Sequence, residues 1–469
     1  MRAWIWKTAE YIRQSYWFIP MLMTLGAVAM SIVMVALDRL EGVSWLERIP
    51  WLYANQPSGA RALLQTTAGS MITVAGVTFS ITIAAVANSS AQFGPSLMTN
   101  FMNDRGNQIT FGTFVATFLY CLLVLRTVRG SDDLSATGVF VPNFAVLGGL
   151  VMALASLGVL IYFIHHIPET IHISQMIARA GRELSDRIEA LYPSRTGRGA
   201  SNDADEGRED FAVTLPTEDV RAVYADTTGY VQNIESKLLM TAAQEHDLVL
   251  WVMKRPGDFA APRTAVVLAK PGGMASDHAV TKIRTAFVFG ARRTSSQDVL
   301  FLVDQLVQVA TCALSPSVND PFTAIYCINW LTAALGKLAE REIPSRFRFD
   351  DAGELRIVAV PVDFEAFADA IFGQLRPYVQ CDRNAALHMF ETMVNLMAQV
   401  PHDMQKAILR RHFEDLRLGC ESDLPHPEDQ QSIKRILKDA ASRWGAWPRE
   451  NFGHESDKAD KNSLDSLES

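Results

Sequence analysis

Alcohol side chains recur within one strongly apolar stretch of this sequence. Residues 66–95, "TTAGSMITVAGVTFSITIAAVANSSAQFGP", are apolar enough to cross a bilayer. Polar side chains and glycines nevertheless return in it at helical spacing, namely Thr66, Ser70, Thr73, Ser80 and Asn88, with Gly69 and Gly76 beside them. At about 100° per residue, these positions gather on one side of a helix. We call this side the polar face.

Two kinds of contact fit the polar face. Small and hydroxyl residues let membrane helices approach closely and form hydrogen bonds across the contact. The same residues, contributed by several copies of a chain, would line a water-filled path of weak selectivity. The polar face holds no acidic or basic side chain, so a proton relay or a charged selectivity ring is not supported. The sequence leaves helix packing and pore lining open.

A second polar group lies in two later segments, "GARRTSSQD" at 290–298 and "LSPSVNDPFTA" at 314–324. Its members are Arg293, Asp298, Asn319 and Asp320. Helix capping explains them in one interpretation, with an N-cap among residues 294–296, Asp298 in the first turn, and Pro321 opening the next helix. In the other interpretation, the four side chains form a polar pocket on neighbouring helices.

Histidine and glutamate recur at helical spacing near residue 170. His165, Glu169 and His172 would align on a continuous helix, and His with carboxylate can bind a divalent ion. Pro168 lies between them and is able to break the helix, and no complete motif such as HExxH is present. The set therefore indicates ordinary interfacial histidines, and we predict no metal and no other cofactor. Without a nucleophile–base pair, a Walker loop or a dinucleotide fingerprint, catalysis has no positive support.

The elements that must position these residues begin with four apolar segments. A span needs about 20 mostly apolar residues, and the segments at 17–37, 64–87, 109–128 and 143–167 qualify. The first follows the start "MRAWIWKTAEYIRQSYW", which has no convincing cleavage site, so we expect a retained helix. The sequence predicts an α-helical, multi-pass membrane domain over residues 1–170.

The remainder of the chain has the composition of a soluble body. We expect a helical stalk and flexible linker at 171–210, a small β-rich module at 211–275 and an α+β domain at 276–445. The charged, apolar-poor segment 446–469 is predicted to be disordered. The fold class is thus a four-helix membrane domain joined to an α+β cytosolic domain with a small β-module.

Charge predicts the orientation and the partners. Basic residues flank the first and fourth spans on the same side, at Arg2, Lys7, Arg13, Arg179, Arg182 and Arg187. This pattern predicts an inner-membrane protein with both termini in the cytosol. The five scattered cysteines lack metal or disulfide spacing, and the net charge of −8 argues against nucleic acid as the main partner. Membrane lipid, further copies of the chain, and a small ion or solute are the expected partners.

Three segments carry a resemblance to a known family. "GSMITVAGVTFSITIAAVANSSAQFGPSLMTNFMNDR", "FGTFVATFLYCLLVLR" and "RRTSSQDVLFLVDQLVQVATCALSPSVNDPFTA" resemble the bacterial family called domain of unknown function 2254. The likeness extends over residues 10–440, and the matching polar positions include Gln92, Phe93, Pro95, Asp104, Arg105, Arg293, Asp298, Asn319 and Asp320. Ser317-Val318 stands where the family pattern has Gly-Ile. The resemblance implies a multi-pass inner-membrane protein with a cytosolic body and no family-wide activity.

Two functional hypotheses follow from these features. The first is an oligomeric channel or channel-like conduit, lined by the polar face, with the cytosolic body as vestibule or sensor. The second is a membrane-anchored scaffold or signalling protein, in which the polar face only joins helices and the Asn319–Asp320 region binds a partner. A membrane enzyme is a third and weaker hypothesis.

Overall fold

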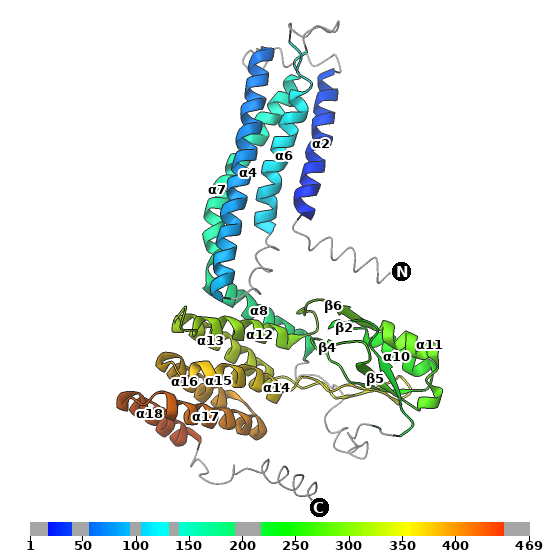
Figure 1. Cartoon of the computed structure of the whole chain (residues 1–469), viewed down its shortest axis with the longest axis vertical. Helices are drawn as coiled ribbons and strands as arrows, with labels where there is room; N and C mark the ends of the chain where they lie inside the picture. The colour runs from blue at the N-terminus through cyan, green and yellow to red at the C-terminus, as the bar shows by residue number, and fades with distance from the viewer. Residues whose placement is uncertain are drawn as a thin grey trace, which may run out of the picture. The chain divides into compact units, whose positions relative to one another are not determined.

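The computed structural model describes residues 17–39, 56–93, 105–130, 140–192, 216 and 218–444. The chain divides into two compact units (Figure 1). The membrane unit comprises Met1–Glu183 and Gln308–Asn319, and the α+β unit comprises Leu184–Val307 and Asp320–Ser469. The predicted linker after residue 192 and the predicted tail at 446–469 lie outside the described residues.

The membrane unit contains four helices that are long and apolar enough to cross a membrane. They are α2 (Phe18–Arg39), α4 (Pro57–Phe93), α6 (Arg105–Leu125) and α7 (Asn143–Ile171). All four predicted spans are therefore confirmed as candidate membrane helices. With 37 residues, α4 extends past both ends of the predicted segment and is about 55 Å long at 1.5 Å per residue.

Helix α6 is the centre of the membrane unit, because it packs against α2, α4 and α7. Its Phe114 and Tyr120 side chains are completely buried. Glycines permit the close approach: a Cβ on Gly112 would collide with Met23 of α2, and a Cβ on Gly148 of α7 would overlap the Tyr120 hydroxyl. Small residues thus work here as packing residues between helices.

We expect Gly148→Ala to destabilise the membrane unit by about 1–3 kcal/mol, because the added methyl group overpacks the contact with Tyr120. Thermal unfolding of the detergent-purified chain measures the loss. Gly158→Ala is the matched control, since it lies in the same helix and its Cβ would have no neighbour within 4 Å. Equal stability of the two variants would contradict this account of the packing.

Hydrogen bonds between helices satisfy polar groups in the membrane unit. The Asp38 carboxylate at the end of α2 accepts from the backbone N–H groups of Phe144 and Ala145, at 2.9 and 3.0 Å. It thereby satisfies donors that the first turn of α7 cannot use within the helix. The buried hydroxyls of Thr117 in α6 and Ser156 in α7 lie 2.9 Å apart. Such bonds matter in a bilayer, where lipid tails offer no replacement partner.

Helix α8 (Ile173–Leu191) follows α7 after a single non-helical residue, His172. Its buried residues recur three or four positions apart, at Ile177, Ala180, Leu184 and Ile188. This is the amphipathic helix that the sequence predicts after the fourth span. Helix α7 itself continues through Pro168 to Ile171, so the proline does not end it.

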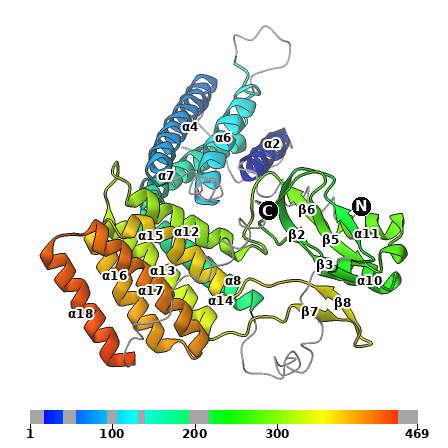
Figure 2. The ribbon, with the colours of Figure 1, turned by 60° about the horizontal axis from the view of Figure 1, so that its bottom comes forward.

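The α+β unit contains two small sheets. The strands are β1 (Arg221–Tyr224), β2 (Gly229–Ile234), β3 (Val249–Val252), β4 (Phe259–Ala260), β5 (Ala265–Lys270), β6 (Phe287–Gly290), β7 (Phe347–Phe349) and β8 (Leu355–Val358). One sheet has the order β1-β5-β3-β8-β7, with β3 and β8 parallel, and the other has the order β4-β2-β6. Strands from the predicted module at 211–275 therefore share a sheet with the later hairpin β7–β8 (Figure 2).

Helices complete the α+β unit. Helices α10 (Ser236–Glu245) and α11 (Asp277–Thr285) accompany the sheets, and Val231, Leu239, Leu250 and Ile283 belong to their common core. The other helices are α12 (Val299–Ala313), α13 (Pro321–Ala339), α14 (Phe364–Ala368), α15 (Gln374–Val379), α16 (Arg383–Gln399), α17 (Asp403–Asp423) and α18 (Pro427–Trp444). The part of α12 from Gln308 onward is assigned to the membrane unit. Helix α16 packs against α13, α17 and α18, with the Phe390 and Phe413 rings 4.9 Å apart.

A proline distorts the helix that joins α14 to α15. The segment Asp369–Gly373 between them forms a π-helical turn. Pro377 in α15 has no N–H group, and its ring crowds the carbonyl group of Gly373, four residues earlier. The widened turn relieves this conflict without ending the helix.

Candidate functional site

The polar face of α4 lies opposite the side on which α4 packs within the chain. The buried residues of α4 are Ala60, Leu64, Ala68, Ala75, Thr78, Thr82 and Val86, which form one continuous stripe. Every predicted member of the polar face is exposed: Thr66, Gly69, Ser70, Thr73, Gly76, Ser80 and Asn88. In a single chain, therefore, the polar face is presented outward.

Space around the glycines distinguishes the polar face from the packed face. A Cβ on Gly69 or on Gly76 would meet nothing within 4 Å, unlike the Cβ positions at Gly112 and Gly148. The Thr73 hydroxyl donates to the carbonyl oxygen of Gly69 at 2.8 Å, so this alcohol is satisfied within its own helix. The polar face therefore leaves room for another helix or for solvent.

The hydroxyl groups that lie between helices are not those of the polar face. Thr78 and Thr82 are on the buried stripe of α4, and Thr117 and Ser156 meet across α6 and α7. The sequence contained a signal for the stripe, because small or aliphatic residues recur at Ala60, Leu64 and Ala68. That signal does not stand out, since the whole helix is apolar.

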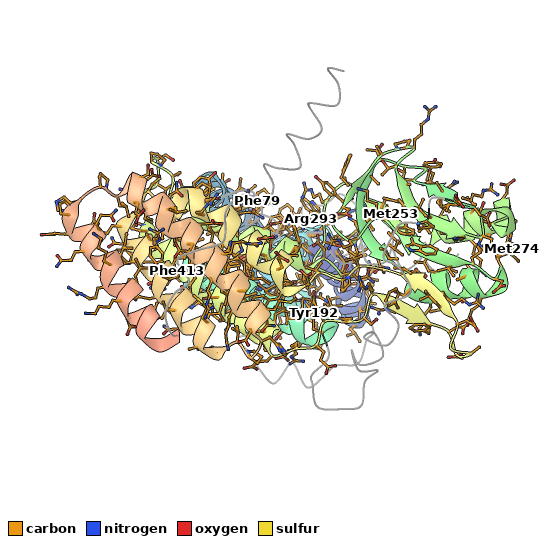
Figure 3. All side chains as sticks on the ribbon, turned by 90° about the horizontal axis from the view of Figure 1, so that it is seen from below. Phe79, Tyr192, Met253, Met274, Arg293 and Phe413 are labelled. Carbon is orange, nitrogen blue, oxygen red and sulfur yellow. The ribbon has the colours of Figure 1, made fainter. Side chains whose placement is uncertain are left out.

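The second predicted group is centred on Arg293, in the loop between β6 and α12. Arg293 lies between the helices and the sheets of the α+β unit (Figure 3). Its Nε donates to Oδ2 of Asp298 at 2.7 Å, and its Nη2 donates to Oδ1 at 3.1 Å. Its Nη1 donates to Oδ2 of Asp304 at 2.6 Å, and Oδ1 of Asp304 accepts from Gln374 at 3.0 Å. We call these four residues the Arg293 cluster.

Asp298 is the buried anchor of the Arg293 cluster, with a side chain only 4% exposed. Its Oδ1 also accepts from the backbone N–H of Phe301 at 3.0 Å and caps the start of α12. Gly257, in the turn between β3 and β4, approaches the same carboxylate so closely that a Cβ would overlap it. Burial works to lower the pKa of Arg293, but the hydrogen bonds to Asp298 and Asp304 outweigh it and raise that pKa.

The capping interpretation therefore needs one correction. Asp298 itself caps α12, whereas the hydroxyls of Thr294 and Ser296 donate to the backbone oxygen of Gln232. Asp298 is the residue directly before α12. Arg293 holds its carboxylate where it accepts from the backbone of the first turn. The sequence alone could not place this arginine.

Asn319 and Asp320 begin α13, as the capping interpretation predicts. Asp320 is the N-cap and accepts from the backbone N–H of Thr323 at 3.2 Å and from its hydroxyl at 2.6 Å. Asn319 has a φ of +51°, a left-handed conformation that asparagine tolerates better than most residues. Of the four residues predicted for a polar pocket, the structure joins Arg293 to Asp298 and uses Asp320 as a cap.

The histidine set lies at the end of α7. His165 and His172 are exposed, and the side chain of Glu169 falls outside the described residues. Among the side chains that the structure describes, no group of three or more His, Cys, Asp or Glu residues could hold a metal ion.

In the Arg293 cluster, one guanidinium group binds two carboxylates, those of Asp298 and Asp304. The cluster therefore has a structural role, in which it connects helices to sheets.

These features define a class: a membrane protein with four candidate membrane helices and a separate α+β unit with two small sheets. The chain belongs to the family of predicted membrane proteins called DUF2254, whose model matches residues 13–395. This match confirms the resemblance seen in the sequence.

Similar proteins occur in mycobacteria. An uncharacterised protein of Mycobacterium bovis is 29% identical over 377 residues, covering 79% of this chain and 69% of the relative. An uncharacterised protein of Mycobacterium tuberculosis shows the same identity and coverage. No solved structure matches the chain.

Proposed function

We propose that the chain assembles into a homo-oligomer whose α4 helices turn their polar faces toward one another and form a conduit for a small ion or solute. The observation that carries the proposal is the outward presentation of the polar face in the single chain. A membrane helix that faced only lipid would have no use for a row of alcohols and glycines. A second copy of the chain, or water held between copies, would use that row.

The spacing of the polar face supports association between copies. Exposed small or hydroxyl residues, with Val77 among them, follow intervals of four and three, at Thr66, Ser70, Thr73, Val77, Ser80, Ala84 and Ala87. A repeat of 3.5 residues keeps one face of a helix against a partner in a left-handed pair or ring. The open space at Gly69 and Gly76 would let another backbone approach, as small residues do in membrane helix pairs.

The rival function is a membrane-anchored scaffold without transport, in which α4 helices pack tightly and the polar face stays dry. Thr73 is compatible with both functions. Its hydroxyl already donates to the carbonyl oxygen of Gly69, so it can lie in a dry contact or in a wet one. The two functions differ in one property, which is the access of water to the polar face within the membrane.

Thiol accessibility measures this property. We expect a charged, membrane-impermeant thiol reagent to label Ser70→Cys and Thr73→Cys in vesicles that contain the full chain. Peptide mass spectrometry separates these thiols from the native cysteines. Ile72→Cys is the matched control, because it lies next to Thr73 in sequence and is exposed in the chain, but on the side away from the polar face. Its contact with lipid should protect it.

Bilayer recordings complete the test. Reconstituted chain should carry current, and labelling of Thr73→Cys should reduce that current, because the reagent would occupy the path. Labelling at Ser70 and Thr73 without labelling at Ile72 supports the conduit. Protection at all three positions, together with silent bilayers, contradicts it and favours the scaffold.

We further propose that the protein lies in a bacterial inner membrane, with both termini and the α+β unit in the cytosol. An even number of candidate spans brings the two ends of the chain to one side. The six basic residues named above, before α2 and after α7, slightly outnumber those of the opposite loops, and this mild difference favours the cytosol for that side. The loop residues are Arg39, Arg48, Arg61, Arg126 and Arg129. The five cysteines are free thiols, which suits a reducing compartment.

A further inference from the structure

Helix α13 of the α+β unit carries a row of three aromatic side chains on its outer side. Phe322 is 65% exposed and Tyr326 is 47% exposed, while Trp330 is half-buried. The three residues are four positions apart, so they are neighbours along one face of the helix. We call them the aromatic row. It belongs to neither the polar face of α4 nor the Arg293 cluster.

The rest of α13 fixes the aromatic row in its outward position. The double hydrogen bond from Thr323 to Asp320 holds the first turn, directly beside Phe322. The opposite side of the helix is buried in the core. Its buried residues are Ala324, Cys327, Ile328, Leu331, Ala334, Leu335 and Leu338. Phe322 and Tyr326 therefore cannot turn inward without displacing that packing.

Single exposed apolar residues are ordinary on protein surfaces and need no explanation. The aromatic row is different, because the exposed residues of α13 beside it are uncharged, and the partly exposed Lys337 on the same face is paired with Glu189. The exposed residues of α13 are Phe322, Tyr326, Asn329 and Ala333. Aromatic and uncharged side chains cost little to remove from water, and the exposed residues of α13 include no carboxylate that would repel the anionic headgroups of a membrane.

We propose that the aromatic row of α13 docks onto the lipid interface of a membrane. Phe, Tyr and Trp are the side chains that collect at this interface, where the rings enter the boundary of the acyl chains and polar tips stay hydrated. The membrane helices also favour lipid, rather than a soluble protein, as the partner of the aromatic row. Its four candidate spans tether the α+β unit to a bilayer, so the lipid surface is always present at high effective concentration.

Photochemical labelling by lipid tests the proposal on the native full chain. The chain is reconstituted in phosphatidylcholine vesicles that contain a small share of a phospholipid with a diazirine near the glycerol end of one acyl chain. After illumination, mass spectrometry counts lipid adducts on each peptide. The α2 peptide is the positive control. We expect adducts on the α13 peptide at about tenfold the yield on α17, because interfacial insertion would bring the aromatic row next to the acyl chains.

Helix α17 is a strict control, because it belongs to the same unit and also exposes large apolar side chains. Met404 is 79% exposed and Leu418 is 56% exposed. Replacing both Phe322 and Tyr326 by Ser should reduce the α13 adducts about tenfold without changing those on α2. Both side chains are exposed, so the double variant should keep its fold, which circular dichroism verifies.

Two outcomes would overturn the proposal. Adducts on α13 no more abundant than on α17 would show that lipid does not reach the aromatic row. Crosslinks between two chains through α13, formed by a bifunctional reagent in a parallel sample without the diazirine lipid, would assign the row to a second copy instead. Neither outcome decides whether water reaches the polar face, which is tested separately at Ser70 and Thr73 of α4.

Discussion

Gly257→Ala is expected to lower the melting temperature of the α+β unit by about 10 °C, a loss of about 3–5 kcal/mol. Two effects act together. Gly257 has a φ of +96°, where a side chain strains the backbone, and a Cβ would overlap the carboxylate of Asp298. To make room, Asp298 would have to leave Arg293 and the first turn of α12. Thermal unfolding of the full chain in detergent, followed by circular dichroism, measures the change.

Gly353→Ala separates the two effects. Gly353 has a comparable φ of +80°, but a Cβ there would meet nothing within 4 Å. This variant should therefore lose only the backbone term, about 1 kcal/mol. An equal loss in the free energy of unfolding of the two variants would mean that the close approach of Gly257 to Asp298 does not contribute to the effect.

Asp298→Ala should destabilise the α+β unit by about 3–5 kcal/mol, because it leaves a half-buried guanidinium with one partner fewer. The loss of the cap on α12 adds to this effect. Asp403→Ala is the matched control on α17: its carboxylate is 99% exposed and pairs with Lys406 in the first turn. An exposed pair of this kind contributes less than about 1 kcal/mol.

A double-mutant cycle then isolates the pair. Arg293→Met and Asp298→Ala should show a coupling of about 2 kcal/mol when combined, because each single change already removes their mutual bonds. Strictly additive losses would mean that the two side chains act independently. The conduit proposal predicts that thiol labelling of α4 stays unchanged in these variants.

Much of the architecture was open to prediction from local sequence. Four apolar segments of sufficient length specify candidate membrane helices, because crossing a bilayer depends on length and hydropathy rather than on a particular neighbour. The Asn-Asp-Pro start of α13 was equally readable, since a cap and an N-terminal proline act within one turn. The spacing of the polar face on α4 also followed from the sequence.

Contacts between distant segments could not be predicted in this way. Strand β8 joins β3 in parallel, although helices α11, α12 and α13 and about a hundred residues separate them. Gly257 approaches Asp298 from a turn in the earlier strands, and Arg293 gains Asp304 only because α12 folds beside its loop. The periodicity of a segment does not indicate which distant segment it will contact.

The polar face shows the division most clearly. Side-chain direction in a helix follows from 3.6 residues per turn, so the order of residues alone specifies that alcohols and glycines share one side of α4. That the opposite side, with Ala60, Leu64 and Ala68, packs within the chain is visible only in the folded structure. Both sides consist mostly of apolar or small residues, so the packing side depends on which surface fits α6 and α7.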